Sequence, residues 1–183
     1  MTPRMPTNHA NEDVSPIADA DAGFQLHIRL ADVEATRVLA INLARISRQG
    51  DVLALEGDLG AGKTEFARAF IRARAGSAIE VPSPTFTLVQ EYEFGDENAL
   101  DSLRHVDLYR LVDAEEALEL GLEEAFETAI CLIEWPDRLG LALPAKNLTI
   151  RLRFCDIPEA RIVDIEGSSL WWRRLTEAGV INA

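Results

Sequence analysis

The chain has 183 residues, of which 48% are hydrophobic and 27% charged, a length that suits one globular domain with a substantial core. No segment approaches the run of about 20 apolar residues that spans a bilayer, which excludes an integral membrane protein, and residues 1–22 lack the apolar segment of a secretory signal. Acidic residues outnumber basic ones by 31 to 18, and the formal charge of −13 disfavours a chain that binds RNA or DNA by itself.

The first part of the chain is predicted to contain a tail, two strands and one helix. Residues 1–22 are polar, rich in Ala, Asp and Pro and without periodicity, so we expect a disordered tail before a single domain over 23–183. An alternating pattern predicts a strand over 24–30, and Asp32 is expected to cap the helix that follows. A short apolar strand over 52–56 then leads into a glycine-rich turn.

Strands and helices continue to alternate after this turn. Phe66, Phe70 and Ala73 recur at helical spacing, which predicts a helix from Lys63 to about Arg74. The other predicted elements are strands over 87–92, 103–107 and 130–134, one helix or two over 113–127, a short helix over 136–141, an antiparallel hairpin of 147–154 and 160–166, and a last helix over 170–178. Strands interleaved with helices indicate an α/β sandwich with a largely parallel centre.

The glycine-rich turn fits the phosphate-loop pattern G-x-x-x-x-G-K-[ST] in full, as Gly57-Asp58-Leu59-Gly60-Ala61-Gly62-Lys63-Thr64. Glycines allow successive backbone N–H groups to wrap a polyphosphate closely. Lys63 can reach the β- and γ-phosphates, and the Thr64 hydroxyl can ligate Mg²⁺ at the start of the helix. Together with the alternating elements, the loop predicts an α/β fold, a P-loop NTPase-like three-layer sandwich with a mostly parallel central sheet and an antiparallel C-terminal hairpin.

Two of the predicted strands downstream end in a carboxylate. Strand 130–134 is continuously apolar up to Glu134, and strand 103–107, which is less apolar, ends at Asp107. In P-loop proteins an apolar strand of this kind places its acid beside the phosphate loop, where it holds the metal. Either acid alone could be an ordinary strand-end carboxylate, but two such strands after one phosphate loop predict that at least one is functional.

The motifs resemble those of the TsaE family, the ATPase subunit of the bacterial machinery that makes threonylcarbamoyladenosine in tRNA. In order, they are GDLGAGKT, SPTFTLVQEY (83–92), HVDLYR (105–110), ELGLEE (119–124) and IEWPDRL (133–139). The phosphate loop is common to many NTPases, but SPTF, HxDLYR and EW together are specific to this family. The resemblance extends from about Leu30 to Leu152.

The resemblance implies a cytoplasmic ATPase that binds ATP or ADP with Mg²⁺. Its implied partners are the threonylcarbamoyl transferase subunit and that subunit's dimerisation companion, with tRNA reached only through them and no membrane involved. By motif, Lys63 holds phosphate, Thr64 and Glu134 ligate magnesium, and Trp135 lies close to the nucleotide. Asp107 is similar to the family's second essential acid, and Thr85 of SPTF belongs to a switch-like loop near the γ-phosphate.

One position departs from the family pattern. Where the family usually has a second hydroxyl residue after GKT, this chain has Glu65. Phosphate-loop proteins bind the α-phosphate through the backbone N–H of this position, so Glu65 is expected to take part in nucleotide binding. Its carboxylate adds negative charge beside an anion, and we expect it to weaken nucleotide affinity.

Three other features are given structural interpretations. His105, next to an acid in a strand, is interpreted as a structural hydrogen-bonding residue. The cluster Trp171–Arg174 is expected to be partly buried on its helix and not to form a base-stacking surface. Cys131 and Cys155 lie in apolar runs without metal-ligand spacing, so we expect two buried, reduced thiols.

Two other functions remain open from the residues alone. A small-molecule kinase would use the same phosphate loop, but such kinases usually carry an arginine-rich lid, and the arginines here are scattered. A GTP-dependent switch is the other alternative. The chain contains no N-K-x-D guanine-reading pattern, which favours adenine over guanine.

Overall fold

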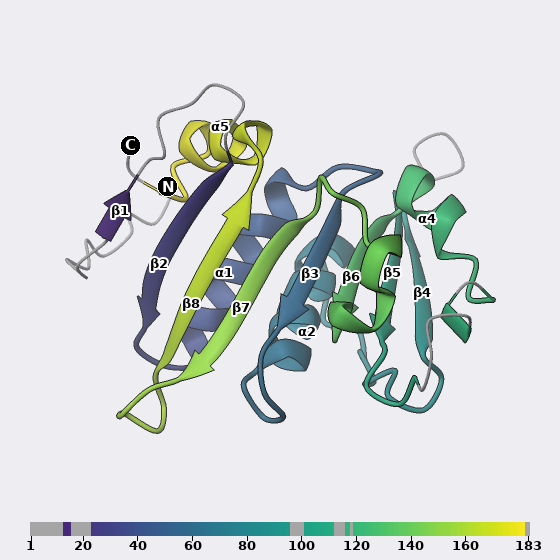
Figure 1. The fold of residues 1–183 in the computed structure, drawn as a ribbon, viewed down its shortest axis with the longest axis horizontal. Helices are drawn as coiled ribbons and strands as arrows, with labels where there is room; N and C mark the ends of the chain where they lie inside the picture. The colour runs from purple at the N-terminus through teal and green to yellow at the C-terminus, as the bar shows by residue number, and fades with distance from the viewer. Residues whose placement is uncertain (1–12, 16–22, 96–100, 112–115, 118, 182–183) are drawn as a thin grey trace.

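The structure of the protein, a computed structural model, describes residues 13–15, 23–95, 101–111, 116–117 and 119–181 (Figure 1). The strands are β1 (Asp13–Ser15), β2 (Phe24–Leu30), β3 (Val52–Glu56), β4 (Val89–Phe94), β5 (Asp101–Asp107), β6 (Ile130–Glu134), β7 (Leu148–Phe154) and β8 (Arg161–Gly167). The helices are α1 (Val33–Ile46), α2 (Lys63–Ala75), α4 (Leu122–Thr128) and α5 (Ser169–Glu177), with a 3₁₀ helix η1 (Pro136–Ala142).

All eight strands belong to one sheet, in the order β1-β2-β8-β7-β3-β6-β5-β4. The four central strands, β7, β3, β6 and β5, run parallel, whereas β4 at one side and β8, β2 and β1 at the other pair antiparallel. Strands β7 and β8 form the expected antiparallel hairpin. The predicted fold class is confirmed, with the parallel pairing confined to the centre of the sheet.

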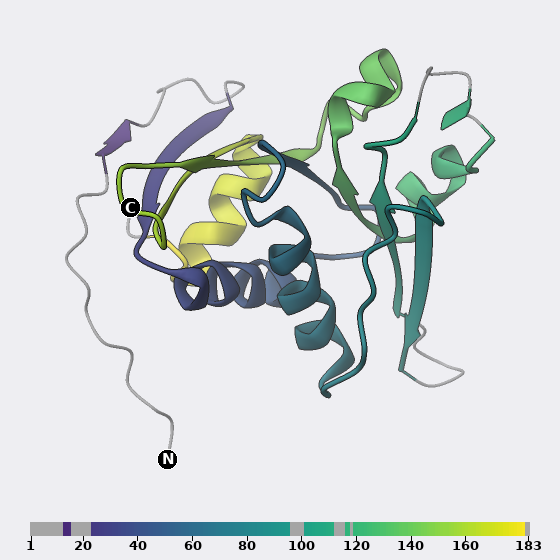
Figure 2. The same cartoon turned by 90° about the horizontal axis from the view of Figure 1, so that it is seen from below.

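Helices cover both faces of this sheet, in line with the three-layer prediction. Helices α1, α2 and α5 lie on one face, while α4 and η1 pack on the other face over β5 and β6 (Figure 2). Residues of β6 alternate between the two layers: Leu132 contacts the first group of helices, and Cys131 and Ile133 contact the second. Each large apolar side chain buried in this way contributes about 1.5–3 kcal/mol.

Helix α2 begins and ends where the sequence predicts. Its first turn follows the phosphate loop directly, and its fully buried Phe66 and Phe70 face the sheet. Gly76 ends the helix with a φ of 64°, a left-handed conformation that glycine adopts without a steric cost. Asp32 caps α1 as expected, since its carboxylate accepts a hydrogen bond from the Ala35 N–H at 2.8 Å.

The strand predicted over 87–92 is wrong at its start, because β4 begins at Val89. Residues 84–87 form a turn, closed by a hydrogen bond from the Leu88 N–H to the Pro84 carbonyl, and Leu88 has a φ of 64°. This turn keeps Thr85 out of the sheet and lets the SPTF segment run along the sheet edge.

The predicted tail and the helix over 113–127 are only partly described. Within 1–22, residues 13–15 form β1, which pairs antiparallel with β2, and the rest of the expected disordered tail lies outside the described residues. Residues 112–115 and 118 of the second segment also lie outside them. Helix α4 starts after Gly121, whose φ of 63° is left-handed, so a helix that runs unbroken over 113–127 is excluded.

The two cysteines differ in environment. Cys131 is fully buried in β6, and burial raises the pKa of its thiol to about 12, so it stays protonated at neutral pH. The expected burial of Cys155 is wrong: this residue follows β7, where the chain turns away from the sheet, and it is only half-buried. Across the described ranges, every helix is too short or too polar to cross a membrane.

Candidate nucleotide-binding site

The phosphate loop connects β3 to α2 and depends on glycine at two positions. Gly57 has a φ of 135°, and a Cβ atom placed there would lie 2.3 Å from the Leu152 carbonyl oxygen. Gly62 is the N-cap of α2 with a φ of 113°. Since L-residues with side chains rarely adopt these conformations, the glycines of the motif are required by the backbone of the loop.

Lys63 is buried at the base of this loop. Its side chain is 4% exposed, and Nζ donates hydrogen bonds to the carbonyl oxygens of Gly57 at 2.5 Å and Asp58 at 2.9 Å. Nζ also lies 4.0 Å from the centroid of the Trp135 ring. Burial lowers the pKa of Lys63, while the nearby carboxylates of Glu134 and Asp107 act in the opposite direction. A desolvated ammonium held mainly by carbonyl dipoles is suited to receive a phosphate group.

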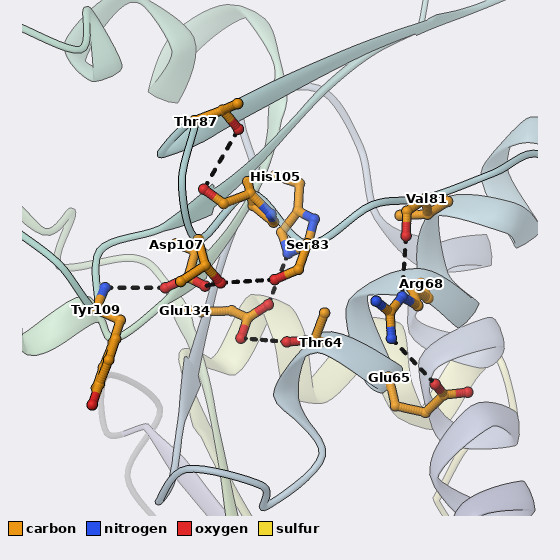
Figure 3. A network of polar contacts seen from close by, with 12 residues as sticks. Thr64, Glu65, Arg68, Val81, Ser83, Thr87, His105, Asp107, Tyr109 and Glu134 are labelled. Atoms are coloured by element: carbon orange, nitrogen blue, oxygen red, sulfur yellow. Dashed lines mark hydrogen bonds and ion pairs between the residues drawn. The ribbon is translucent and has the colours of Figure 1, made fainter.

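Glu134 and Thr64 meet beside the loop. The Thr64 hydroxyl donates to Glu134 Oε2 at 2.9 Å, and the Glu134 side chain, at the end of β6, is almost fully buried (Figure 3). Hydroxyl and carboxylate oxygens are ligands that Mg²⁺ prefers, so the donor set fits this ion. Among the described residues no group of three or more His, Cys, Asp or Glu forms a metal cage, and Mg²⁺ bound to a nucleotide takes its remaining ligands from phosphates and water.

Asp107 lies next to Glu134 because β5 and β6 pair in parallel with these two residues in register. Its carboxylate accepts hydrogen bonds from the Thr85 hydroxyl at 2.5 Å and from the Tyr109 N–H at 3.0 Å. The Thr85 hydroxyl is also 2.8 Å from that of Ser83. The structure therefore brings the SPTF loop into contact with the acid of HVDLYR.

Trp135 follows Glu134 and has an unusual backbone. Its φ of 61° and ψ of 51° are left-handed, a conformation that costs a residue with a side chain about 1–2 kcal/mol. In this conformation the indole ring packs against Lys63 and lies 5.0 Å from the Tyr109 ring, centroid to centroid. The strain places an aromatic side chain at the wall of the site.

These side chains enclose one cavity of about 380 Å³. Its lining residues are Leu59, Gly60, Gly62, Lys63, Thr64, Glu65, Thr85, Asp107, Tyr109, Arg110, Glu134 and Trp135. The cavity thus unites most of the residues that the sequence singles out. Tyr109 and Arg110 also line the cavity but were not predicted as site residues. Their position directly after Asp107 in the HVDLYR motif could have indicated that they belong to the site.

Three residues of the phosphate loop lie behind the cavity wall. Gly57 and Asp58 line a neighbouring hollow and offer their carbonyls to Lys63. Ala61 is buried, and its carbonyl accepts a hydrogen bond from Arg161 Nε at 3.0 Å. These residues hold the shape of the loop, while Gly60, Gly62 and Thr64 face the cavity.

The guanidinium of Arg37 lies beside the Glu65 carboxylate, a contact that the sequence pattern did not predict. Oε1 accepts from Arg37 Nε of α1 at 2.7 Å, and Oε2 is 3.9 Å from Arg68. The hydrogen bonds that Arg37 donates to Glu65 and Glu34 raise the pKa of Arg37. The negative charge that we expected to oppose the α-phosphate is therefore offset by Arg37.

Replacing Glu65 by threonine is accordingly expected to change ADP affinity by less than about threefold, because surface ion pairs contribute little. Isothermal titration calorimetry with ADP measures this change. The matched variant Arg37→Gln removes the closer of the two cationic partners of the carboxylate and is expected to weaken ADP binding by about two- to fivefold. A tenfold gain from Glu65→Thr would show that Arg37 does not screen the carboxylate.

The cluster Trp171–Arg174 is not part of this site. Trp171 is buried in the core, and Trp172 packs on Phe24 with ring centroids 5.5 Å apart. Arg174 forms an ion pair with Asp51 at 2.5 Å. The expectation of partial burial is confirmed.

Comparison with known proteins places this geometry in context. The profile of a family described as "Threonylcarbamoyl adenosine biosynthesis protein TsaE" matches residues 30–161. A "tRNA threonylcarbamoyladenosine biosynthesis protein TsaE" of Bacillus subtilis (strain 168) is 41% identical over 130 residues, which cover 70% of this chain and 78% of that protein. A protein of the same name from Rickettsia felis is 39% identical over 127 residues, covering 69% and 72% respectively. The crystal structure of YdiB from Bacillus subtilis aligns with a TM-score of 0.67 and 31% identity, covering 85% of this chain and 94% of that chain.

Proposed function

The chain belongs to the TsaE family, and on this premise we propose that it is a cytoplasmic P-loop ATPase that binds and hydrolyses Mg-ATP within the complex forming threonylcarbamoyladenosine in tRNA. The contact between Thr64 and Glu134 carries the proposal. It joins the hydroxyl at the end of the phosphate loop to the acid at the end of the neighbouring strand, 2.9 Å apart and beside the buried ammonium of Lys63.

Most residues that line the cavity have a role in this proposal. The backbone N–H groups of residues 60–65 and the ammonium of Lys63 bind the phosphates of ATP or ADP. Thr64 and Glu134 hold Mg²⁺, which when bound neutralises phosphate charge. Asp107 orients the attacking water, and the hydrogen bond from Thr85 couples this acid to the SPTF loop.

Exposed apolar side chains near the cavity favour the proposal that partner proteins bind at this face. Leu59, in the phosphate loop, is 73% exposed, and Phe86, next to Thr85, is 82% exposed. Tyr109, which lines the cavity, is also exposed. Apolar side chains gathered around a functional site favour a protein interface. We assign this face to the transferase subunit and its dimerisation companion, which would also carry the contacts to tRNA.

The proposal is tested by measuring ATP turnover and tRNA binding, first with the chain alone and then with the transferase pair. We expect slow turnover alone and an increase of at least tenfold with the partners, since a group supplied in trans to a P-loop site can be worth 10³–10⁵ in rate. We expect no salt-sensitive tRNA binding by the chain alone, because its charge of −13 repels the phosphate backbone.

A variant in the apolar face separates the partner contact from the nucleotide site. Phe86→Ser is expected to reduce the stimulated turnover while leaving the ADP affinity of the isolated chain unchanged. The control is Leu141→Ser, a fully exposed apolar residue in η1 that does not line the cavity. Turnover that is indifferent to the partners, or tight tRNA binding by the lone chain, would contradict the proposed division of labour.

A further inference from the structure

We propose that His105 is a positioning residue that holds the Glu134 carboxylate in the orientation needed to bind Mg²⁺, an inference that rests on the proposed function. His105 is fully buried, and its Nε2 lies 2.9 Å from Glu134 Oε1 (Figure 3). It does not line the cavity. It therefore acts through Glu134, without touching the nucleotide.

The register of the sheet explains why these two residues meet. In the parallel pair β5–β6, Asp107 lies opposite Glu134 and His105 lies opposite Leu132. Alternate residues of a strand share a face, so His105, two residues before Asp107 in β5, lies on the same face as Asp107 and Glu134, toward α2. Its neighbours on that face, Leu103 and Leu132, belong to the apolar core. Within this layer the imidazole gives the inner carboxylate oxygen a polar partner.

The two oxygens of Glu134 receive one donor each. Oε2 accepts from the Thr64 hydroxyl at 2.9 Å, and Oε1 accepts from His105 at the same distance. An ionised carboxylate only accepts hydrogen bonds, so the His105 nitrogen facing it carries the proton. With a donor on each oxygen, the plane of the carboxylate is fixed. With Thr64 alone, the carboxylate plane could rotate about its last single bond, and the oxygen lone pairs would no longer keep one direction toward the cavity.

The other ring nitrogen of His105, Nδ1, forms no hydrogen bond that would stabilise the core of the described structure. Nδ1 of His105 is buried and has no hydrogen-bond partner in the described part of the chain. Burying a polar atom without a partner is unfavourable, and an apolar side chain would avoid that cost. The single hydrogen bond of the ring is directed at Glu134, which favours positioning of the acid over a purely structural role.

The test compares two amide variants that differ in reach. The side-chain N–H of His105→Gln extends about as far as Nε2, whereas that of His105→Asn reaches only as far as Nδ1 and falls short of Glu134. A third variant, His105→Leu, removes the donor altogether. Two measurements are made on each isolated variant: Mn²⁺ affinity of the ADP complex by electron paramagnetic resonance, and ADP affinity without metal by calorimetry. Turnover with the transferase pair is measured on the same variants.

We expect His105→Asn and His105→Leu to lose about tenfold or more in Mn²⁺ affinity, because partners of a metal ligand typically contribute 10- to 100-fold. ADP affinity without metal should be unchanged, whereas turnover with the transferase pair should fall and the KM for Mg-ATP should rise, because weaker metal binding lowers the affinity for the metal–nucleotide complex. His105→Gln should recover most of both losses. If the Leu variant does not fold, the Asn and Gln pair still decides the question.

Two results would overturn the inference. One is wild-type Mn²⁺ affinity in His105→Asn. The other is an equal loss in the Asn and Gln variants with a parallel loss of metal-free ADP binding, since this would identify a purely structural residue. A wild-type ADP complex that binds no Mn²⁺ would instead overturn the proposed function itself, and the inference with it.

Discussion

Replacing Glu134 by glutamine is expected to lower ATP hydrolysis in the assembled complex by at least a hundredfold. The amide keeps the volume of the side chain, and its single oxygen can still accept from one of the two donors, Thr64 or His105, but it loses the negative charge that holds the metal. Removal of a single electrostatic contribution at such a site typically costs about 10²–10³ in kcat. The measurement is turnover with the transferase pair, together with ADP affinity in the presence and absence of Mg²⁺.

The neighbouring acid provides the matched variant. Asp107→Asn keeps the size of the side chain and one acceptor oxygen, which can serve the Tyr109 N–H, and it is also expected to lower hydrolysis by orders of magnitude. Because Asp107 is assigned to the water and not to the metal, Mg²⁺-dependent ADP binding should survive better in this variant than in Glu134→Gln. Normal hydrolysis by both variants in the complex would reduce the two acids to ordinary strand-end carboxylates.

Replacing Lys63 by alanine is expected to weaken ATP and ADP binding by about ten- to a hundredfold. Hydrogen bonds to charged groups contribute about 1.5–3 kcal/mol, and Lys63 is the buried cation of the cavity. Its ammonium donates hydrogen bonds to the carbonyls of Gly57 and Asp58, so part of the interaction with phosphate would replace these two hydrogen bonds. Calorimetric titration with ADP and with ATP measures the loss.

The chain offers a matched control for this variant. Lys146→Ala removes the same charge from an exposed position between η1 and β7, and it should leave nucleotide affinity unchanged. Thermal unfolding of Lys63→Ala shows whether the loop still folds, because the two carbonyls lose their donor. An unaltered dissociation constant for ATP in Lys63→Ala would remove the phosphate-loop assignment.

Local patterns in the sequence determined most of the elements and the identity of the phosphate loop. Strands β3 and β6 and helix α2 have the boundaries that apolar runs, helical spacing and Gly76 predict. These features depend on residues close together in the chain, where side-chain periodicity and backbone preference act directly. The start of β4 was predicted two residues too early because the positive φ that ends the preceding loop falls at Leu88, a residue type that gives no turn signal.

Contacts between distant residues were decided only by the tertiary structure. The sequence offered Asp107 and Glu134 as two separate strand-end acids, and their adjacency results from the order β3-β6-β5 in the sheet. The partners of Glu65 and Glu134, Arg37 and His105, come from other elements, 28 and 29 residues away in the chain. Such pairs follow from how whole elements pack, a sum over many apolar contacts that no short motif contains. The sequence therefore determined which chemical groups the site contains, while the packing of β5, β6, α1 and α2 decided which of them touch.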